Sequence, residues 1–150
     1  MNRLRRAWRA FLDLSWPQRR SLALAWLLLP AGALGLRLLG FTRLQAVLLP
    51  RRRALASRTD VGEAQAIARM VDAAGRWNPV QTSCLVRSLV LCHLLRRKGL
   101  AAELRIGVTP PDGNFSAHAW VEHEGVALAE AGAAGARYSA FDDPALPRGI

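Results

Sequence analysis

The chain has 150 residues, enough for one ordinary globular domain with its own hydrophobic core. Hydrophobic residues make up 51% of the chain and charged residues 21%, which excludes intrinsic disorder over most of the length. Twenty-one Lys and Arg against eleven Asp and Glu give a net charge of +10, which attracts acidic peptides, anionic lipids or nucleic acids without choosing among them.

The first fifty residues are expected to form helices. Residues 2–14 fit a basic amphipathic helix, and Ser15-Trp16-Pro17 is typical of an N-cap followed by proline in the first turn of the next helix. That second helix is expected to end near Leu29, because residues 30–35 contain a proline and two glycines. The apolar helical pattern resumes over residues 36–49.

Residues 21–36 form a stretch of sixteen residues without a charge. The stretch is shorter than the roughly 20 residues that a bilayer core requires, and basic residues flank it on both sides. A membrane-spanning helix and a helical pair that is buried or docks on a surface both remain open, and the length favours the pair. A signal peptide is not expected, because the apolar run begins late after the first arginines.

Two more helices are expected in the second half. Apolar residues recur at helical spacing over residues 60–74, and Gly75 is a candidate C-terminal cap. The next helix is expected to run from a cap at Thr82 or Ser83 to about Lys98.

Alternating apolar and polar residues then predict three strands. They cover residues 104–108, 116–122 and 126–130. The expected fold class is therefore α+β. Residues 1–55 are expected to form a helical region used for docking. Residues 56–150 are expected to form the core, in which the N-terminus of a helix packs on a small antiparallel sheet.

The two cysteines, Cys84 and Cys92, are expected about two turns apart in one helix, too far apart for a disulfide. Free thiols suit a reducing cytosol, so a cytoplasmic protein is expected. Cys84 falls in the opening turn of the helix, where unpaired N–H groups and the helix dipole stabilise a thiolate. A buried, inert thiol is the alternative for Cys84 and the better description of Cys92, which lies on the apolar side.

His118 and Glu130 are the other two members of a candidate catalytic group. Glu130 follows His118 by twelve residues, beyond a glycine-containing turn. If residues 123–125 form a three-residue loop, Glu122 pairs with Val126 and His118 lies opposite Glu130. A two-residue loop would turn the two side chains to opposite faces, so the candidate triad requires the longer loop.

A recognisable order of motifs runs through the second half: Cys84-Leu85-Val86-Arg87 at a helix start, the strand over residues 104–108, then His118-Ala119-Trp120-Val121-Glu122 and Gly125. This order resembles the transglutaminase-like superfamily. More narrowly, it is similar to the stand-alone leader peptidases of lasso-peptide biosynthesis, which share the Ala-His-Ala-Trp-Val-Glu stretch and a helical N-terminal region.

The resemblance implies a transglutaminase-like or papain-like core and a cysteine-protease triad. In that triad Cys84 is the nucleophile, His118 its base and Glu130 the acid. The family usually has aspartate at the position of Glu130. A glutamate can still orient the imidazole, and Asp142 and Asp143 are substitutes if it does not.

The resemblance also implies a substrate and partners. The substrate is a ribosomally made lasso-peptide precursor, whose leader peptide is removed so that the amine of the core can form a macrolactam. A separate small leader-recognition protein would present the leader, and an asparagine-synthetase-like cyclase would close the ring. Separately from the resemblance, the lack of clustered Cys or His at ligand spacing predicts no metal, and no cofactor or nucleic-acid partner is expected. Weak membrane association stays open.

Other residues receive secondary roles. Gln81 is either a second oxyanion donor beside the N–H of the nucleophile or a loop residue. Arg87 is expected to face solvent, Trp120 to lie in the core or the cleft wall, and His93 and His123 to lie on the surface.

Two other functions remain open. The same triad would support acyl transfer to an amine, as in true transglutaminases. A non-catalytic module would instead bury Cys84 and use the basic N-terminal half to bind a membrane or nucleic acid.

Overall fold

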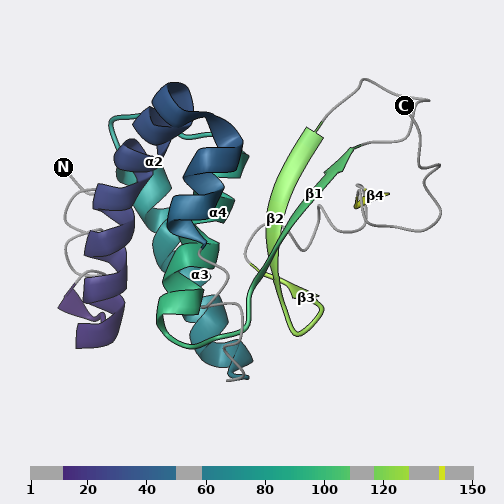
Figure 1. Cartoon of the computed structure of the whole chain (residues 1–150). Helices are drawn as coiled ribbons and strands as arrows, with labels where there is room; N and C mark the ends of the chain where they lie inside the picture. Colours follow the sequence, from purple (N-terminus) through teal and green to yellow (C-terminus); the bar gives the residue numbers. More distant parts are fainter. Residues whose placement is uncertain (1–11, 50–58, 109–116, 129–138, 141–150) are drawn as a thin grey trace.

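The computed structural model describes residues 12–49, 59–108, 117–128 and 139–140. In this part of the chain, helices α2 (Trp16–Leu48), α3 (Val61–Trp77) and α4 (Cys84–Arg97) come first (Figure 1). Strands β1 (Glu103–Val108), β2 (Ala117–His123), β3 (Val126–Ala127) and β4 (Ser139–Ala140) follow. The expected combination of helices with a small antiparallel sheet is confirmed.

The sheet is antiparallel throughout, with the strand order β3-β2-β1-β4. β1 and β2 pair along their length, with Glu103 opposite Glu122 and Gly107 opposite His118. β4 joins the same end of β1, where Ala140 lies opposite Gly107. His118 therefore lies at the end of the sheet at which β4 is added.

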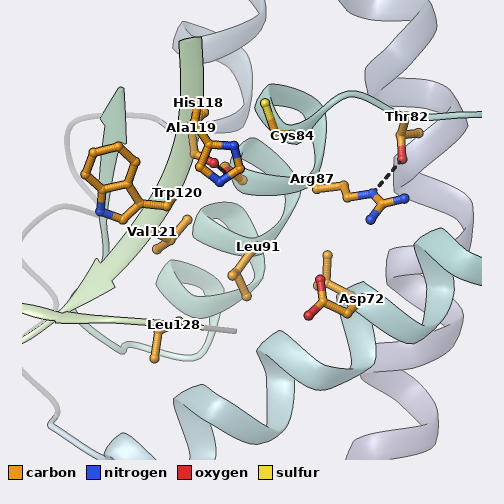
Figure 2. Close-up of a pocket in the computed structure, with 12 residues that line it drawn as sticks. Asp72, Thr82, Cys84, Arg87, Leu91, His118, Ala119, Trp120, Val121 and Leu128 are labelled. Carbon is orange, nitrogen blue, oxygen red and sulfur yellow. Dashed lines mark hydrogen bonds between the residues drawn. The ribbon is translucent and has the colours of Figure 1, made fainter. Parts of the chain in front are cut away.

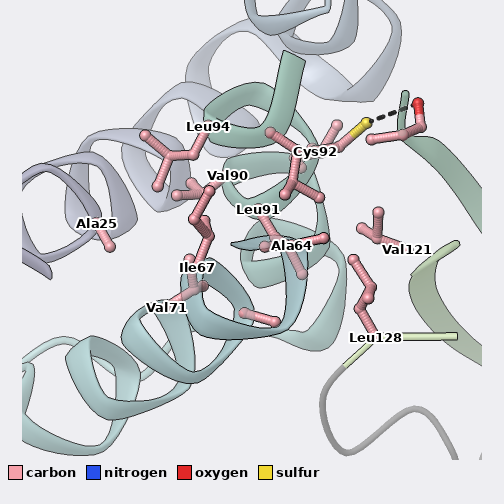
Figure 3. Packing of buried hydrophobic residues seen from close by; sticks show 14 of the residues in the cluster. Ala25, Ala64, Ile67, Val71, Val90, Leu91, Cys92, Leu94, Val121 and Leu128 are labelled. Carbon is pink, nitrogen blue, oxygen red and sulfur yellow. Dashed lines mark hydrogen bonds between the residues drawn. The ribbon is translucent and has the colours of Figure 1, made fainter. Parts of the chain in front are cut away.

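Helix α4 lies at the centre of the fold. It contacts α2 and α3 and also packs on β1 and β2, so that the helices form one layer beside the sheet (Figure 1). One buried apolar cluster joins the three helices to β2, and Leu104 of β1 packs against it. Its members include Ala25, Ile67, Val71, Val90, Leu94, Val121 and Leu128 (Figure 3). The expected domain boundary at residue 55 falls outside the described residues.

The interruption expected at residues 30–35 is wrong. Helix α2 continues through Pro30, and its break lies at Gly40, whose φ of 75° and ψ of 171° are not helical. Proline has no N–H to donate to the carbonyl of Trp26, and the side-chain amide of Asn78 donates to that carbonyl instead, 2.9 Å away. A residue from α3's C-terminal end thus replaces the missing donor.

The two glycines after Pro30 serve packing. A Cβ atom at Gly32 would lie 3.1 Å from Cγ1 of Val86 on α4. A Cβ atom at Gly35 would lie 2.9 Å from Cδ1 of Leu44, which belongs to the arm of α2 beyond the break. The small residues therefore let α2 approach α4 closely and let its two arms fold against each other.

Side-chain caps begin both of the following helices. Asp60 accepts a hydrogen bond from the third residue of α3 at 2.9 Å, and Ser83 accepts one from the third residue of α4 at 3.4 Å. The Ser83 cap confirms the predicted start of α4. Gly75 does not end α3, however, since the helix continues to Trp77.

The turn between β2 and β3 has two residues, so the expected three-residue loop is wrong. His123 pairs with Val126, and the turn residues Glu124 and Gly125 have φ angles of 52° and 73°. Two successive left-handed residues are characteristic of a type I′ turn, whose twist matches that of a hairpin. Glu122 pairs with Ala127 and not with Val126, so the pairing that was expected to place Glu130 opposite His118 is wrong.

His123 is fully buried, which corrects its expected surface position. Its Nδ1 bonds to the carbonyl of Ala101, and its Nε2 accepts the N–H of Asp60 at 3.2 Å. These partners select the neutral imidazole with its proton on Nδ1. His93, also expected on the surface, is half-buried, with Nδ1 2.7 Å from the carbonyl of Leu48.

Candidate active site

A pocket of about 270 Å³ lies among α3, α4 and β2, and both Cys84 and His118 line it (Figure 2). The two residues come from different elements, Cys84 from the helix wall and His118 from the strand wall. The volume lies just below the range of roughly 300–1,000 Å³ that is typical of ligand pockets. The predicted thiol and imidazole are therefore brought to one cavity.

Cys84 is the first residue of α4 and follows the capping residue Ser83. The N–H groups of a first helical turn have no acceptor within the helix, and the positive end of the helix dipole lies there. The thiol is free and its residue is half-buried, so it has access to the pocket without being fully exposed.

One buried hydrogen bond joins the two walls of the pocket. Ser88 lies one turn after Cys84, and its hydroxyl donates to the carbonyl of Ala119 at 2.9 Å. Ala119 is the neighbour of His118 in β2. Because Ser88 and Ala119 are both buried, this bond sets the spacing between the turn that carries the thiol and the strand that carries the imidazole.

His118 is half-buried and stacks on Trp120, with ring centroids 6.4 Å apart and ring planes 16° apart. Residues two apart in a strand share a face, which brings the rings together. The residue opposite His118 on β1 is Gly107, which has no side chain to crowd the imidazole. The expected position of Trp120 in the core or cleft wall is confirmed, since it is 3% exposed and lines the pocket.

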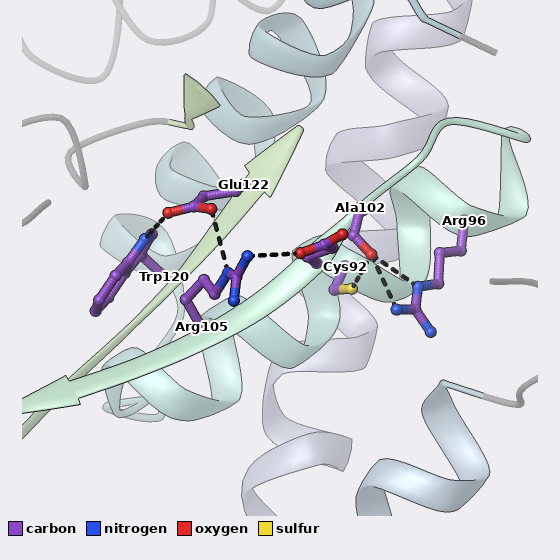
Figure 4. A network of polar contacts seen from close by, with 7 residues as sticks. Cys92, Arg96, Ala102, Arg105, Trp120 and Glu122 are labelled. Carbon is purple, nitrogen blue, oxygen red and sulfur yellow. Dashed lines mark hydrogen bonds and ion pairs between the residues drawn. The ribbon is translucent and has the colours of Figure 1, made fainter. Parts of the chain in front are cut away.

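A chain of polar contacts holds Trp120 on its far side (Figure 4). The indole N–H donates to Oε1 of Glu122 at 2.9 Å. Oε2 of Glu122 accepts from Nε of Arg105 at 3.2 Å, and Arg105 also forms an ion pair with Glu103 at 2.9 Å. The indole of Trp120, on which His118 stacks, is thus held by side chains from both β1 and β2.

The helix side of the pocket carries a cation that was expected to face solvent. Arg87 lines the pocket, and its Nε donates to Oγ1 of Thr82 at 3.2 Å (Figure 2). A Cβ atom at Gly75 would lie 2.9 Å from the same Nε. The guanidinium of Arg87 thus occupies the space that a side chain at position 75 would need, which explains why a glycine is found there within α3.

Asp72 also lines the pocket, from α3, and it is the one carboxylate that does so among the residues that the structure describes. Helical periodicity offered a signal for it, because Asp72 falls one turn after the buried Ala68 and one turn before the buried Gly75. Sequence reasoning missed this acid, as it missed Thr82 and Ser88.

The remaining predicted site residues are not placed on the pocket. Glu130, Asp142 and Asp143 lie outside the described residues, so Glu130 stays a prediction. Gln81 is exposed and is not among the lining residues, whereas its neighbour Thr82 is.

The second thiol has a different environment. Cys92 is fully buried, and its Sγ lies 3.5 Å from the carbonyl of Ala102, which also accepts two hydrogen bonds from Arg96 (Figure 4). Burial raises the pKa of Cys92 to about 11, although the positive charge of Arg96 opposes the shift. Cys92 is thus a core residue, as predicted, and both thiols are free.

Comparison with known families identifies the group to which the chain belongs. The family model of the transglutaminase-like superfamily matches residues 25–141, well over half of the chain. The protein belongs to the transglutaminase-like superfamily. Members of this superfamily are usually catalytic, as cysteine proteases or acyltransferases. No curated protein and no solved structure gives a significant match.

The superfamily match begins inside α2, so it includes the helix that packs against α4 as well as the pocket elements. Within the matched residues, Cys84 and His118 place a thiol and an imidazole on one pocket. No cluster of three or more His, Cys, Asp or Glu able to hold a metal ion occurs within the described residues.

Proposed function

We propose that the protein is a cysteine peptidase in which Cys84 is the nucleophile and His118 its base. The observation that carries this proposal is the position of a thiol in the first turn of α4 on the same pocket as an imidazole of β2. Membership of the transglutaminase-like superfamily supports the same chemistry, because its usual members transfer acyl groups through a cysteine.

The mechanism follows from these two side chains. His118 takes the proton of the Cys84 thiol, and the thiolate attacks the carbonyl carbon of the scissile peptide bond. The tetrahedral intermediate collapses as the imidazolium protonates the leaving amine, which leaves a thioester on Cys84. His118 then deprotonates water, which attacks the thioester and releases a carboxylate product and the free thiol.

Backbone N–H groups in the first turn of α4 are suited to the oxyanion of the intermediate. They have no acceptor within the helix and lie at its positive end. Family resemblance is now the only support for Glu130 as the orienting acid, because the two-residue turn removes the pairing expected to place it opposite His118. Asp142 and Asp143 are its replacements. Asp72 joins these candidates because it lines the pocket.

For the substrate, we propose the leader region of a lasso-peptide precursor, with the cleaved core passed to an asparagine-synthetase-like cyclase in the cytoplasm. The support is the resemblance of residues 117–122, Ala-His-Ala-Trp-Val-Glu, to the leader peptidases of that pathway. A separate small leader-recognition protein is the proposed partner that presents the leader.

Mass spectrometry of a candidate precursor peptide, incubated with the leader-recognition protein, tests this function. Wild type, Cys84→Ala and the matched control Cys92→Ser are compared, since the control alters a buried cysteine away from the pocket. We expect cleavage by wild type and Cys92→Ser and none by Cys84→Ala. Equal cleavage by all three would remove the nucleophile assignment.

Two further readouts separate the competing functions. Adding small primary amines distinguishes hydrolysis from acyl transfer, because transfer adds the mass of the amine to the product. Iodoacetamide labelling near pH 6 tests the catalytic role without any substrate, since only an activated thiolate reacts there. We expect labelling of Cys84 that His118→Ala abolishes, and an unreactive Cys84 would favour a non-catalytic module.

A further inference from the structure

The outer side of helix α2 is apolar although nothing in the described structure covers it. Trp16, Leu27, Leu34 and Leu38 are 77%, 60%, 57% and 73% exposed. Their spacings of eleven, seven and four residues place all four on one side of the helix. We call these four residues the outer stripe.

The opposite side of α2 is buried. It carries Ser21, Ala25, Leu29 and Gly32, which pack toward α3 and α4. Gly32 sits so close to α4 that an added Cβ atom would lie 3.1 Å from Val86. Helix α2 is therefore fastened to the core along one side and unpartnered along the other.

The outer stripe is longer than the isolated apolar side chains that are found on the surface of any protein. From Trp16 to Leu38 it extends for about 33 Å at 1.5 Å per residue. Helix α2 is also the one described helix long and apolar enough to cross a membrane by length and composition, and only 17% of its most apolar window is buried. A continuous exposed patch of this kind marks a docking surface.

Charge favours a bilayer surface as the occupant. Arg20 and Arg37 of α2 are exposed near the two ends of the stripe, and Arg43 is exposed in the arm beyond the break at Gly40. The sequence has eight arginines and no acidic residue between Asp13 and Asp60. A Leu and Trp face on a helix whose charged residues are all arginines is the pattern of a helix that lies in the interface of an anionic membrane.

We propose that the outer stripe docks α2 on the surface of an anionic lipid bilayer, with the helix parallel to the membrane plane. The helix lies on the membrane and does not cross it, because crossing would detach its buried side from α3 and α4. The stripe lies on the side of α2 opposite its buried residues, whereas the pocket is lined by α3, α4 and β2. Docking therefore leaves the pocket open to solvent, and the proposal does not depend on the proposed peptidase activity.

Sedimentation of the full chain with vesicles tests the proposal. The vesicles contain phosphatidylcholine alone or phosphatidylcholine mixed with phosphatidylglycerol. The test variant is Leu34→Glu combined with Leu38→Glu, and the matched control is Val61→Glu combined with Gln65→Glu, which adds the same charge at the same spacing on exposed positions of α3. Circular dichroism checks that both variants keep the helical content of wild type.

We expect wild type and the α3 control to bind the anionic vesicles within twofold of each other and the α2 variant to bind at least tenfold less. Absence of wild-type binding, or equal binding by the α2 variant, would overturn the proposal. So would resistance of the bound protein to alkaline carbonate, which indicates a spanning helix. A wild-type dimer that the α2 variant converts to a monomer, without vesicle binding, would assign the stripe to a second copy instead.

Discussion

The side-chain amide of Asn78 donates a hydrogen bond to the carbonyl of Trp26, one turn before Pro30 in α2. Asn78→Ala is therefore expected to lower the free energy of unfolding by about 1 kcal/mol. Asn78→Ala also removes the acceptor of the Val80 N–H at 3.0 Å, a loss that is the same in both backgrounds. In a Pro30→Ala background the backbone regains its own donor for the Trp26 carbonyl, so the same substitution should cost less than it does beside Pro30. Urea unfolding of the four proteins measures the coupling, and strictly additive losses would contradict it.

Ser88→Ala removes the bond between the two walls of the pocket. We expect the rate of peptide cleavage to fall about tenfold or more, because the spacing between Cys84 and His118 is no longer held. Ser21→Ala is the matched control, since its hydroxyl makes a similar bond of 3.0 Å to a carbonyl in α2, away from the pocket. Steady-state kinetics of both variants is the measurement, and equal losses would indicate a general effect on stability.

Substitutions of Glu122 test whether Trp120 positions His118. Glu122→Ala removes the acceptor for the indole N–H, whereas Glu122→Gln retains an acceptor and loses only the charge that pairs with Arg105. We expect kcat to fall several-fold in Glu122→Ala, with KM nearly unchanged, and to recover in Glu122→Gln. An equal fall in both variants would place the effect in the ion pair instead of the indole.

The orienting acid is identified by four amide substitutions. Removing the charge from the acid of a triad lowers kcat by a factor on the order of 10⁴ in well-studied enzymes. We expect Glu130→Gln to give a loss of more than about 100-fold. The other three, Asp72→Asn, Asp142→Asn and Asp143→Asn, should stay within a few-fold of wild type. A large loss in one of those three alone would move the role to that residue.

The buried thiol of Cys92 is expected to lower the free energy of unfolding at alkaline pH. Its thiol ionises near pH 9.0 when unfolded, but burial raises the pKa to about 11 in the folded protein. The unfolded state therefore releases the proton first, and stability that is full below pH 9.0 declines as the pH rises to about 11, by up to about 3 kcal/mol. Urea unfolding over this range should show a shallower decline for Cys92→Ser, whose hydroxyl does not ionise.

Features that depend on local chemistry were predictable from the sequence. The cap at Ser83 and the strand predicted over residues 104–108 depend on neighbours in the chain, and both match the structure. The thiol at the start of α4 follows from the cap. These features carry the α+β class and half of the candidate site.

Features that depend on distant partners were not predictable. Pro30 reads as a helix breaker until the amide of Asn78 supplies the missing donor. Gly75 resembles a helix cap in the sequence, but the guanidinium of Arg87 fills the space that a side chain at this position would need.

The length of the hairpin loop was predicted wrongly for a local reason. Glu124 occupies a left-handed conformation that is more typical of Gly, Asn or Asp.

Strand β2 is fastened at both ends, by the Ser88 hydroxyl beside His118 and by the buried imidazole of His123 at the turn. Opening the strand at either end would expose a buried polar group, so β2 and the start of α3 should open together rather than fray separately. Their amide protons should then exchange with solvent deuterium at similar, slow rates. Bonds at both ends of β2 thus fix the position of the His118 imidazole relative to the helix turn that carries Cys84.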